Sequence, residues 1–285
     1  MTNLQAGTVV TLEVKNESPF GYFLTDGNED VLLHQNEIKE EFNPEEPVEV
    51  FLFQDHQGRT AATMTIPSVQ IGKYDWVKVV EVKEGLGVFV DIGLRKDMLV
   101  SEDDLPLLAS VWPEKGDSLY CTLKLDKRDR LYAKPATEDV MEGLFTKAAR
   151  EDFNKNITGI VYRATKAGTF IITAEGYRGF IHDSQRRVEP RLGQKVDGRI
   201  IDVKQDGSVN VSLLGRKHEA LSEDAEIIYT YLEGRGGSMP YSDKSLPEEI
   251  EKRFGLSKGA FKRALGSLMK AGKVYQENGW THIKK

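Results

Sequence analysis

Aromatic side chains next to a glycine stand near the start of this 285-residue chain, in a spacing that suits binding chemistry. Phe20 and Phe23 bracket Gly21, and His34 ends the apolar run that follows. An aromatic ring offers a flat face on which a base can stack, and a nearby cation can attract a phosphate. These residue types therefore indicate a binding surface rather than a catalytic centre.

The same pattern occurs twice more along the chain, which makes it an internal repeat. The second copy is Leu86-Gly87-Val88-Phe89 followed by Met98-Leu99-Val100, and the third is Ala167-Gly168-Thr169-Phe170 followed by Gly179-Phe180-Ile181-His182. The second copy has Leu86 and Val100 where an aromatic residue and the histidine are expected. The third copy has Ala167 in place of the first aromatic residue.

Alternating apolar residues around each copy predict five short strands, which is typical of a small antiparallel barrel. The chain is therefore expected to be multidomain and mainly β, with OB-fold barrels over residues 1–68, 69–136 and 153–217. Residues 137–152 begin with Thr137, which is a good N-cap residue. Acidic residues follow in the first turn, and the basic residues Lys147 and Arg150 come near the end, as the helix dipole favours. Residues 137–152 are predicted to form a helical linker between the second and third barrels.

From His218 the apolar period changes from two to 3.6, which predicts a different, α+β domain over residues 218–285. One helix ends at the glycines of 234–237, a short helix covers 246–254, and Ser257 caps a helix that ends near Lys270. Asn278-Gly279 is a strong signal for a hairpin. Two helices joined by a short turn and followed by a hairpin predict a winged helix.

The repeats resemble the S1 RNA-binding domain, an OB-fold barrel that presents aromatic side chains to single-stranded RNA. The resemblance implies binding roles for Phe20, Phe23, His34 and Arg59 in the first barrel, for Phe89 and Arg130 in the second, and for Phe170 and His182 in the third. In this family an aspartate lies four residues before the arginine, and Asp55 and Asp126 match it, whereas the third copy has Lys204 and Ser208. Asp55 is expected to orient Arg59 rather than to meet a phosphate.

The order of three S1-like barrels and a winged helix resembles the bacterial conserved virulence factor B family over nearly the whole chain. The resemblance implies a cytoplasmic protein that binds single-stranded RNA without catalysis and regulates gene expression. Aromatic residues beside a glycine also fit a barrel core, and a single histidine is often structural. For each of these positions, an RNA-binding role and a structural role therefore both remain open.

Charge is distributed unevenly along the chain. The net charge is −6, but residues 1–68 carry −9 and residues 152–217 carry +5. Candidate phosphate contacts in the third repeat are Arg163, Lys166 and Arg178, and those in the predicted recognition helix are Lys258, Lys262 and Arg263. Because phosphate attraction dominates non-specific affinity, the third barrel and the winged helix are expected to contribute most to binding. Several weak sites on one chain would then act by avidity.

Catalytic motifs do not occur in the sequence, which has no phosphate-binding loop, nucleophile elbow or paired metal ligands. No enzyme activity, cofactor or metal is therefore expected. The single cysteine, Cys121, fits a buried strand, and no apolar run reaches the roughly 20 residues that span a bilayer.

Two alternatives remain open from the sequence. The winged helix could bind duplex DNA as a regulator, or the domains could serve as an adaptor that docks on ribosome or nuclease components.

Overall fold

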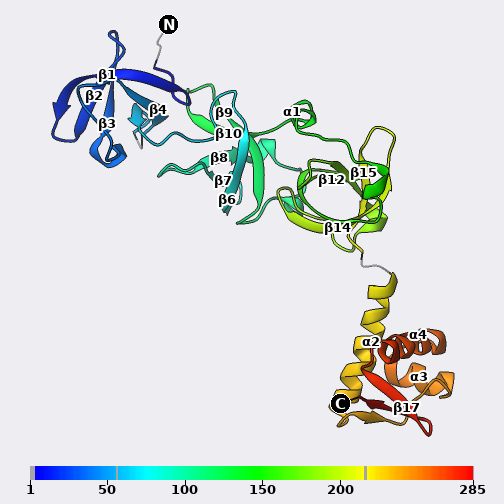
Figure 1. The fold of residues 1–285 in the computed structure, drawn as a ribbon. Coiled ribbons are helices and arrows are strands. Elements are labelled where there is room, and N and C mark those ends of the chain that lie inside the picture. Colours follow the sequence, from blue (N-terminus) through cyan, green and yellow to red (C-terminus); the bar gives the residue numbers. More distant parts are fainter. Residues whose placement is uncertain (1–3, 56, 215–216, 285) are drawn as a thin grey trace. The chain divides into compact units, whose positions relative to one another are not determined.

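The computed structural model describes residues 4–55, 57–214 and 217–284. The chain divides into two compact units, Met1–Leu213 and Leu214–Lys285. The first unit contains the three strand-rich repeats, and the second contains helices packed on a small sheet (Figure 1). The predicted mainly β, multidomain fold is confirmed.

The first repeat forms a closed five-stranded barrel with the strand order β1-β2-β3-β5-β4. Alternation places Leu24, Leu33 and Val50 inside, where each is fully buried. The barrel closes through a parallel pairing of β3 with β5, so it is not antiparallel throughout. Its strands are β1 (Val9–Ser18), β2 (Gly21–Thr25), β3 (Asp30–His34), β4 (Val48–Gln54) and β5 (Thr60–Thr63), and the short 3-10 turn η1 covers Gln35–Glu37.

The third repeat has the same topology and also closes, which Figure 1 shows as a ring of strands. Its parallel closing pair is β13 with β15. Its elements are β11 (Asn156–Thr165), β12 (Gly168–Thr173), β13 (Arg178–His182), η5 (Asp183–Gln185), β14 (Lys195–Val203) and β15 (Val209–Ser212).

The second repeat has the same strand order as the other two, but its sheet is open. Its outer strands β8 and β10 contact each other without a hydrogen-bonded ladder. Its elements are β6 (Asp75–Lys83), β7 (Gly87–Asp91), β8 (Met98–Ser101), η2 (Glu102–Asp104), η3 (Ala109–Val111), β9 (Ser118–Leu125) and β10 (Leu131–Pro135). Cys121 lies fully buried in β9, as predicted, and burial raises the pKa of its thiol.

The glycine of each repeat is required by a close approach of two strands. Gly21, Gly87 and Gly168 have φ angles of +141°, +133° and +155°. A Cβ atom at these positions would lie 2.2, 2.1 and 2.5 Å from the carbonyl oxygen of the facing strand. A Cβ atom cannot approach a carbonyl oxygen this closely, so only glycine fits at these three positions. The repeated glycine therefore fixes the start of β2, β7 and β12.

The junctions between neighbouring barrels of the first unit are packed and hydrogen bonded. The Gln54 side chain accepts from the backbone N–H of Leu131 at 2.9 Å and donates to the carbonyl of Asp129. Phe51 of β4 and Leu192 belong to the buried cluster of the second barrel. The core of the middle barrel therefore extends into both neighbours.

The predicted helix over residues 137–152 is wrong for most of its length. The structure has the helix α1 only over Glu138–Glu142 and a 3-10 turn, η4, over Arg150–Asp152. Between them a turn at Gly143 and Leu144 is followed by non-helical chain, in which Thr146 bridges to Tyr177 of the third barrel. Thr137 stands at the N-cap position, but its side chain makes no capping hydrogen bond. Gly143, which ends α1, was the local signal for the break.

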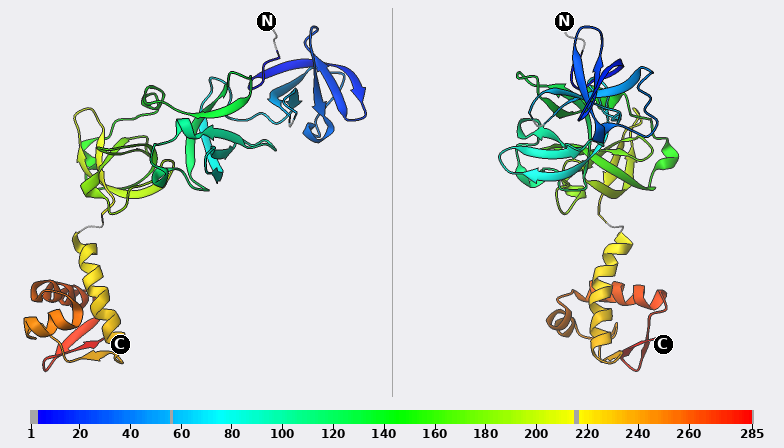
Figure 2. Two further views of the ribbon diagram at one scale, coloured as in Figure 1. Left: turned by 180° about the vertical axis from the view of Figure 1, so that it is seen from behind. Right: turned by 90° about the vertical axis from the view of Figure 1, so that its left-hand side faces the viewer.

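The second unit is a winged helix, as predicted. Helix α4 packs on α2, and α3 lies beside α4 (Figure 2). Ser257 caps α4 by accepting from the N–H of Ala260, and Asn278 and Gly279 turn the wing with positive φ angles. The elements are α2 (Lys217–Gly234), β16 (Ser238–Met239), α3 (Pro247–Phe254), α4 (Lys258–Lys270), β17 (Val274–Glu277) and β18 (Trp280–Ile283).

None of the helices in the described part of the chain is both long enough and apolar enough to cross a bilayer. The same residues bring together no group of three or more His, Cys, Asp or Glu side chains that could hold a metal ion.

Candidate nucleic-acid interface

The aromatic residues of the first barrel lie on its outer surface. Phe20 is 64% exposed in the turn before β2, and Phe23 is half-buried on β2 opposite Leu32. Their neighbours Tyr22 and Leu24 pack in or against the core instead. Phe20 and Phe23 are therefore placed to meet a ligand rather than to fill the barrel.

The second barrel covers part of this outer surface. His34 and Arg59 line a cavity of about 200 Å³ that is also lined by Arg95 from the second repeat. Arg95 lies 3.4 Å from the Glu37 carboxylate and donates to the carbonyl of Asn36 at 3.2 Å. The structure thus brings His34 and Arg59 together, but Phe20 and Phe23 lie outside the lining of the cavity.

The expected arginines of the first two barrels are held by their own aspartates. Arg59 donates to one oxygen of Asp55 at 2.6 and 2.8 Å, and Arg130 does the same to Asp126 at 2.7 and 2.8 Å. Hydrogen bonds from the backbone and side chain of Arg130 lower the pKa of Asp126 from 3.8 to about 2. At Asp55, burial raises the pKa, but the hydrogen bonds from Arg59 outweigh it and leave the pKa below its usual value. These carboxylates are ionised at neutral pH and neutralise much of the charge of each arginine.

The histidine of the repeat has a structural contact in the two barrels that keep it. His34 and His182 accept from the backbone N–H two residues later and so cap the 3-10 turns η1 and η5. In the second barrel Ser101 caps η2 in the same way and pairs with Gly87. Ser101, and not Val100, is therefore the counterpart of the histidines, which corrects the alignment made from the sequence. Val100 is fully buried in the core.

The second barrel presents an acidic surface. Phe89 is half-buried on β7 opposite Leu99. Arg130 and Lys96 line a pocket of about 590 Å³ together with Asp103, Asp104 and Asp126 of the same barrel and Asp55 of the first barrel. Negative charge of this kind repels phosphates, so this pocket is poorly suited to a nucleic acid.

The third barrel carries a continuous row of aromatic rings. Phe170 on β12 pairs with Phe180 on β13, with ring centroids 5.0 Å apart. His182 continues the row from Phe180 at 6.4 Å, and Tyr162 extends it from Phe170 at 6.2 Å. Phe145 of the linker ends the row, 5.7 Å from Tyr162. We call Phe145, Tyr162, Phe170, Phe180 and His182 the aromatic row.

Cations flank the aromatic row on several strands. The guanidinium carbons of Arg178 and Arg163 lie 5.0 and 5.9 Å from the centre of the Phe170 ring, and the Lys204 ammonium lies 5.9 Å from that of Phe180. Lys166 is exposed in the hairpin between β11 and β12. Of the residues predicted for the third barrel, the structure gathers Arg163, Phe170, Arg178 and His182 at one site, with Lys166 beyond it.

Glu138 of α1 holds two of these arginines in place. Its carboxylate pairs with Arg178 at 2.7 Å and with Arg163 at 3.1 Å, and it accepts from the Tyr162 hydroxyl at 3.0 Å. Burial raises the pKa of Glu138, but the hydrogen bonds from Arg163 and Tyr162 and the charge of Arg178 bring it below its usual value. One negative charge facing two positive charges leaves the site net positive.

A bulge in β11 explains why the sequence did not reveal the whole site. The register of β11 on β12 shifts between Val161 and Arg163, so Tyr162 and Arg163 both contact Phe170. Strict alternation would send them to opposite faces of the sheet. Phe180 was detectable, because it lies two residues from both Arg178 and His182 and shares their face. Phe145 had no local signal, since it comes from the linker that was expected to be helical.

The basic residues predicted in the winged helix lie on α4 away from the core. Lys262 and Arg263 are exposed and Lys258 is half-buried, whereas Phe261 and Leu265 are buried on the other side of the helix. The wing adds three stacked rings that sequence reasoning did not single out. Tyr275 and His282 have centroids 5.1 Å apart, and Trp280 lies 6.5 Å from His282.

Comparison with protein families assigns all four domains. Residues 6–65 match the S1 domain, residues 74–134 the CvfB first S1-like domain, residues 141–215 the second domain of virulence regulatory factor CvfB, and residues 226–283 the CvfB-like winged helix domain. The region that the family describes as its first S1-like domain is thus the second barrel of this chain.

Similar whole proteins support the same assignment. The uncharacterized protein YitL of Bacillus subtilis is 55% identical over 99% of this chain and 95% of its own. Conserved virulence factor B of Staphylococcus epidermidis is 36% identical and covers 97% of both chains. A Streptococcus pneumoniae crystal structure described as a multidomain protein with nucleic acid binding domains is 38% identical, with a TM-score of 0.67 over 98% of both chains. The chain belongs to the conserved virulence factor B family.

Proposed function

We propose that this protein binds single-stranded RNA without catalysis and regulates gene expression after transcription, in the cytoplasm. The aromatic row of the third barrel is the principal site in this proposal. Phe20, Phe23, His34 and Arg59 form a weaker site on the first barrel, and Phe89 and Arg130 contribute least.

The observation that carries the proposal is the aromatic row with Arg163, Arg178 and Lys204 beside it. Stacking on an aromatic ring contributes about 1–3 kcal/mol per base, and it tolerates any sequence because every base has a flat face. Phe170 and Phe180 are already packed side by side, so little ordering is needed when a strand binds. The nucleic-acid-binding description of the Streptococcus pneumoniae structure supports the same class of ligand.

The salt dependence of binding tests the electrostatic part of the proposal. Full-length protein is titrated with labelled single-stranded RNA, single-stranded DNA and duplex DNA of equal length from 50 to 300 mM salt, a range of about sixfold. Each phosphate neutralised on a single strand contributes about −0.7 to the slope of log affinity against log salt. Three cations at the third barrel therefore predict a slope of about −2 or steeper, with RNA bound most tightly.

The outcomes of this titration separate the proposal from its alternatives. Tightest binding to single-stranded RNA supports it. No binding of any nucleic acid at the lowest salt contradicts it and leaves a protein adaptor as the remaining function.

Duplex DNA binding is a second candidate, favoured by Lys262 and Arg263 on the exposed side of α4. A winged helix that enters a major groove presents this helix to the bases. Preference for the duplex in the same titration, lost in the variant Lys262→Ala/Arg263→Ala, supports this candidate instead.

A further inference from the structure

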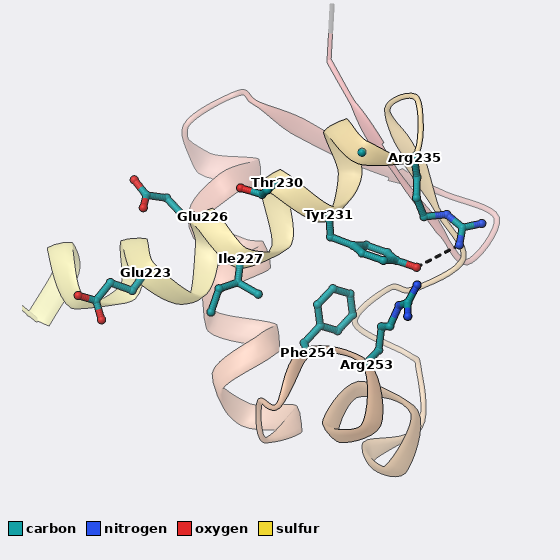
Figure 3. Close-up of a pocket in the computed structure, with 9 residues that line it drawn as sticks. Glu223, Glu226, Ile227, Thr230, Tyr231, Arg235, Arg253 and Phe254 are labelled. Carbon is teal, nitrogen blue, oxygen red and sulfur yellow. Dashed lines mark hydrogen bonds between the residues drawn. The ribbon is translucent and has the colours of Figure 1, made fainter.

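A pocket of about 860 Å³ lies in the winged-helix unit, separate from the aromatic row. Residues of α2 and the last residues of α3 line it (Figure 3). Tyr231, Arg235 and Arg253 lie at one end of the pocket, and Glu223 and Glu226 lie at the other (Figure 3). We call Tyr231, Arg235 and Arg253 the arginine end.

Two guanidinium groups converge on one tyrosine at the arginine end. Arg235 Nη1 donates to the Tyr231 hydroxyl at 3.1 Å, and its guanidinium carbon lies 5.7 Å from the ring centre. Arg253 stacks closer, at 4.6 Å from the same ring centre. Both arginine side chains point toward the hydroxyl (Figure 3). Two like charges held this close repel each other, so the arrangement favours a bound anion.

The tyrosine ring that organises the arginines is fixed by its neighbours. Tyr231 packs edge-to-face on Phe254 at 5.0 Å and contacts Tyr241 at 6.1 Å, and Phe254 and Tyr241 lie 5.3 Å apart. A ring held by two others has little rotational freedom. The donors at the arginine end are therefore preorganised, which reduces the entropy lost when a ligand binds.

Among the described residues, no carboxylate forms an ion pair with either guanidinium group of the arginine end. Arg235 and Arg253 both contact Tyr231, whereas Arg59, Arg130 and Arg178 each pair with an acid. Burial raises the pKa of Tyr231, but hydrogen bonds from Arg253 and Arg235 and their charges bring it below its usual value. The electrostatic potential at the Tyr231 hydroxyl is therefore positive.

The shape of the charge distribution selects the kind of anion. Two guanidinium forks and a hydroxyl match the several unesterified oxygens of a phosphate monoester better than the two oxygens of a carboxylate. Glu226 lies eight positions before Gly234, the last residue of α2, which corresponds to about 12 Å of helix, and Arg235 follows directly. A strand that ran through the whole pocket would bring further phosphates toward Glu223 and Glu226. A terminal phosphate avoids that repulsion.

The floor of the pocket suits the organic part of a nucleotide. Ile227 is 46% exposed between the two charged ends, and Phe254 lies beneath Tyr231 (Figure 3). Apolar surface beside an anion site can cover a sugar or a base. Inorganic phosphate would leave this surface unused.

We infer that the arginine end binds the phosphate monoester of a nucleotide, at the end of an RNA strand or on a free mononucleotide. The choice of ligand class rests on the proposed RNA binding. Arg235 and Arg253 contact the phosphate oxygens, the Tyr231 hydroxyl donates to one of them, and the nucleoside lies over Ile227.

The test compares RNAs that differ only at their ends. Full-length protein is titrated with one labelled RNA sequence that carries a 5′-phosphate, a 3′-phosphate or hydroxyl groups at both ends, and separately with AMP. A terminal phosphate at one end is expected to tighten binding by about tenfold, which corresponds to one charge-assisted hydrogen bond. AMP is expected to bind on its own and to compete with the phosphorylated RNA.

Variants assign the effect to the pocket. Arg235→Ala/Arg253→Ala is expected to remove the preference for the phosphorylated end while binding of the hydroxyl-ended RNA is maintained. Lys244→Ala/Lys252→Ala removes two positive charges from exposed positions outside the pocket and serves as the matched control. Tyr231→Phe keeps the ring and removes only the hydroxyl, so it tests the site if the double arginine variant does not fold.

Each outcome has a definite meaning. If hydroxyl-ended RNA binds but neither a terminal phosphate nor AMP has any effect, the pocket inference is wrong and the proposed function stands. If no RNA binds but AMP binds and the arginine variants abolish it, the site is real, its ligand is a free nucleotide and the proposed function fails. A preference for phosphorylated ends that survives in both arginine and tyrosine variants overturns the inference.

Discussion

Phe170→Ala is the sharpest test of the aromatic row. The change removes the ring between Tyr162 and Phe180 and the ring beside Arg163, and it leaves Arg178 only the more distant Phe145 ring at 6.0 Å. Stacking of one base on an aromatic ring contributes about 2 kcal/mol to the free energy of binding, the middle of the usual range. Its loss corresponds to about 30-fold weaker RNA binding.

The variant should remain folded, because Phe170 is half-buried and lies outside the buried core cluster of its barrel. It loses the aromatic pairs with Tyr162 and Phe180 and the cation–π contacts with Arg163 and Arg178. Together these contribute about 2–5 kcal/mol of unfolding free energy. Fluorescence anisotropy with labelled single-stranded RNA measures binding, and thermal unfolding measures the folding cost.

The repeat supplies matched controls for this experiment. Phe23 and Phe89 occupy the same position of the barrel as Phe170, but each faces a leucine where Phe170 faces Phe180. Phe23→Ala and Phe89→Ala are expected to weaken RNA binding less than about threefold, because they lack the second ring and the surrounding cations. An unchanged affinity in a folded Phe170→Ala variant refutes the reasoning, and so does an equal loss in all three variants.

Three further predictions follow from individual contacts. Glu138→Gln should raise RNA affinity severalfold, since it removes the negative charge beside the arginines, and should lower unfolding stability by about 1 kcal/mol; weaker RNA binding by this variant contradicts the placement of the site. Asp126 has a pKa of about 2 in the folded protein against an ordinary 3.8, so its contribution to stability is present above about pH 4 and is lost as the pH falls toward 2. Unfolding measured across this range should show the loss in the wild type, and Asp126→Asn should remove that component of the pH dependence. Gly168→Ala should cost about 2 kcal/mol or more, because its Cβ would lie 2.5 Å from a carbonyl oxygen, whereas Gly266→Ala on the open side of α4 should stabilise the protein by about 1 kcal/mol. Chemical denaturation compares the two, and equal effects would argue against the strand approach described at Gly168.

The parts of the fold that follow from local rules could be predicted from the sequence. The repeated glycine, the alternating strands, the cap at Ser257 and the Asn278-Gly279 turn each depend on residues near one another in the chain, and all were interpreted correctly. Sequence comparison of the repeats also placed Lys204 and Ser208 at the positions of Asp55 and Arg59, and the backbone hydrogen bonds between the paired positions match.

The features that sequence reasoning missed depend on long-range contacts. The bulge in β11 depends on pairing with β12, and only the folded barrel brings Phe145 and Glu138 of the linker to Phe170 and its arginines. The linker helix is an exception, because its early end has a local cause: Gly143 stops α1, although the charge pattern of residues 137–152 is typical of a longer helix. The counterpart of the histidine in the second barrel was assigned wrongly to Val100. Ser101 caps the turn there with a hydroxyl in place of an imidazole, so residue type alone does not reveal the matching position.

The shared core at the barrel junctions has a consequence for how the protein can be divided. Phe51 is fully buried in the cluster of the second barrel although it belongs to the first, and Leu192 of the third barrel lies in the same cluster. A truncation between the first two barrels would expose the Phe51 ring to water and remove packing from both fragments. The first unit is therefore expected to melt as a single cooperative block, and a barrel cut out alone should be prone to aggregation. Point substitutions in the intact chain keep that block whole and report on the binding surfaces themselves.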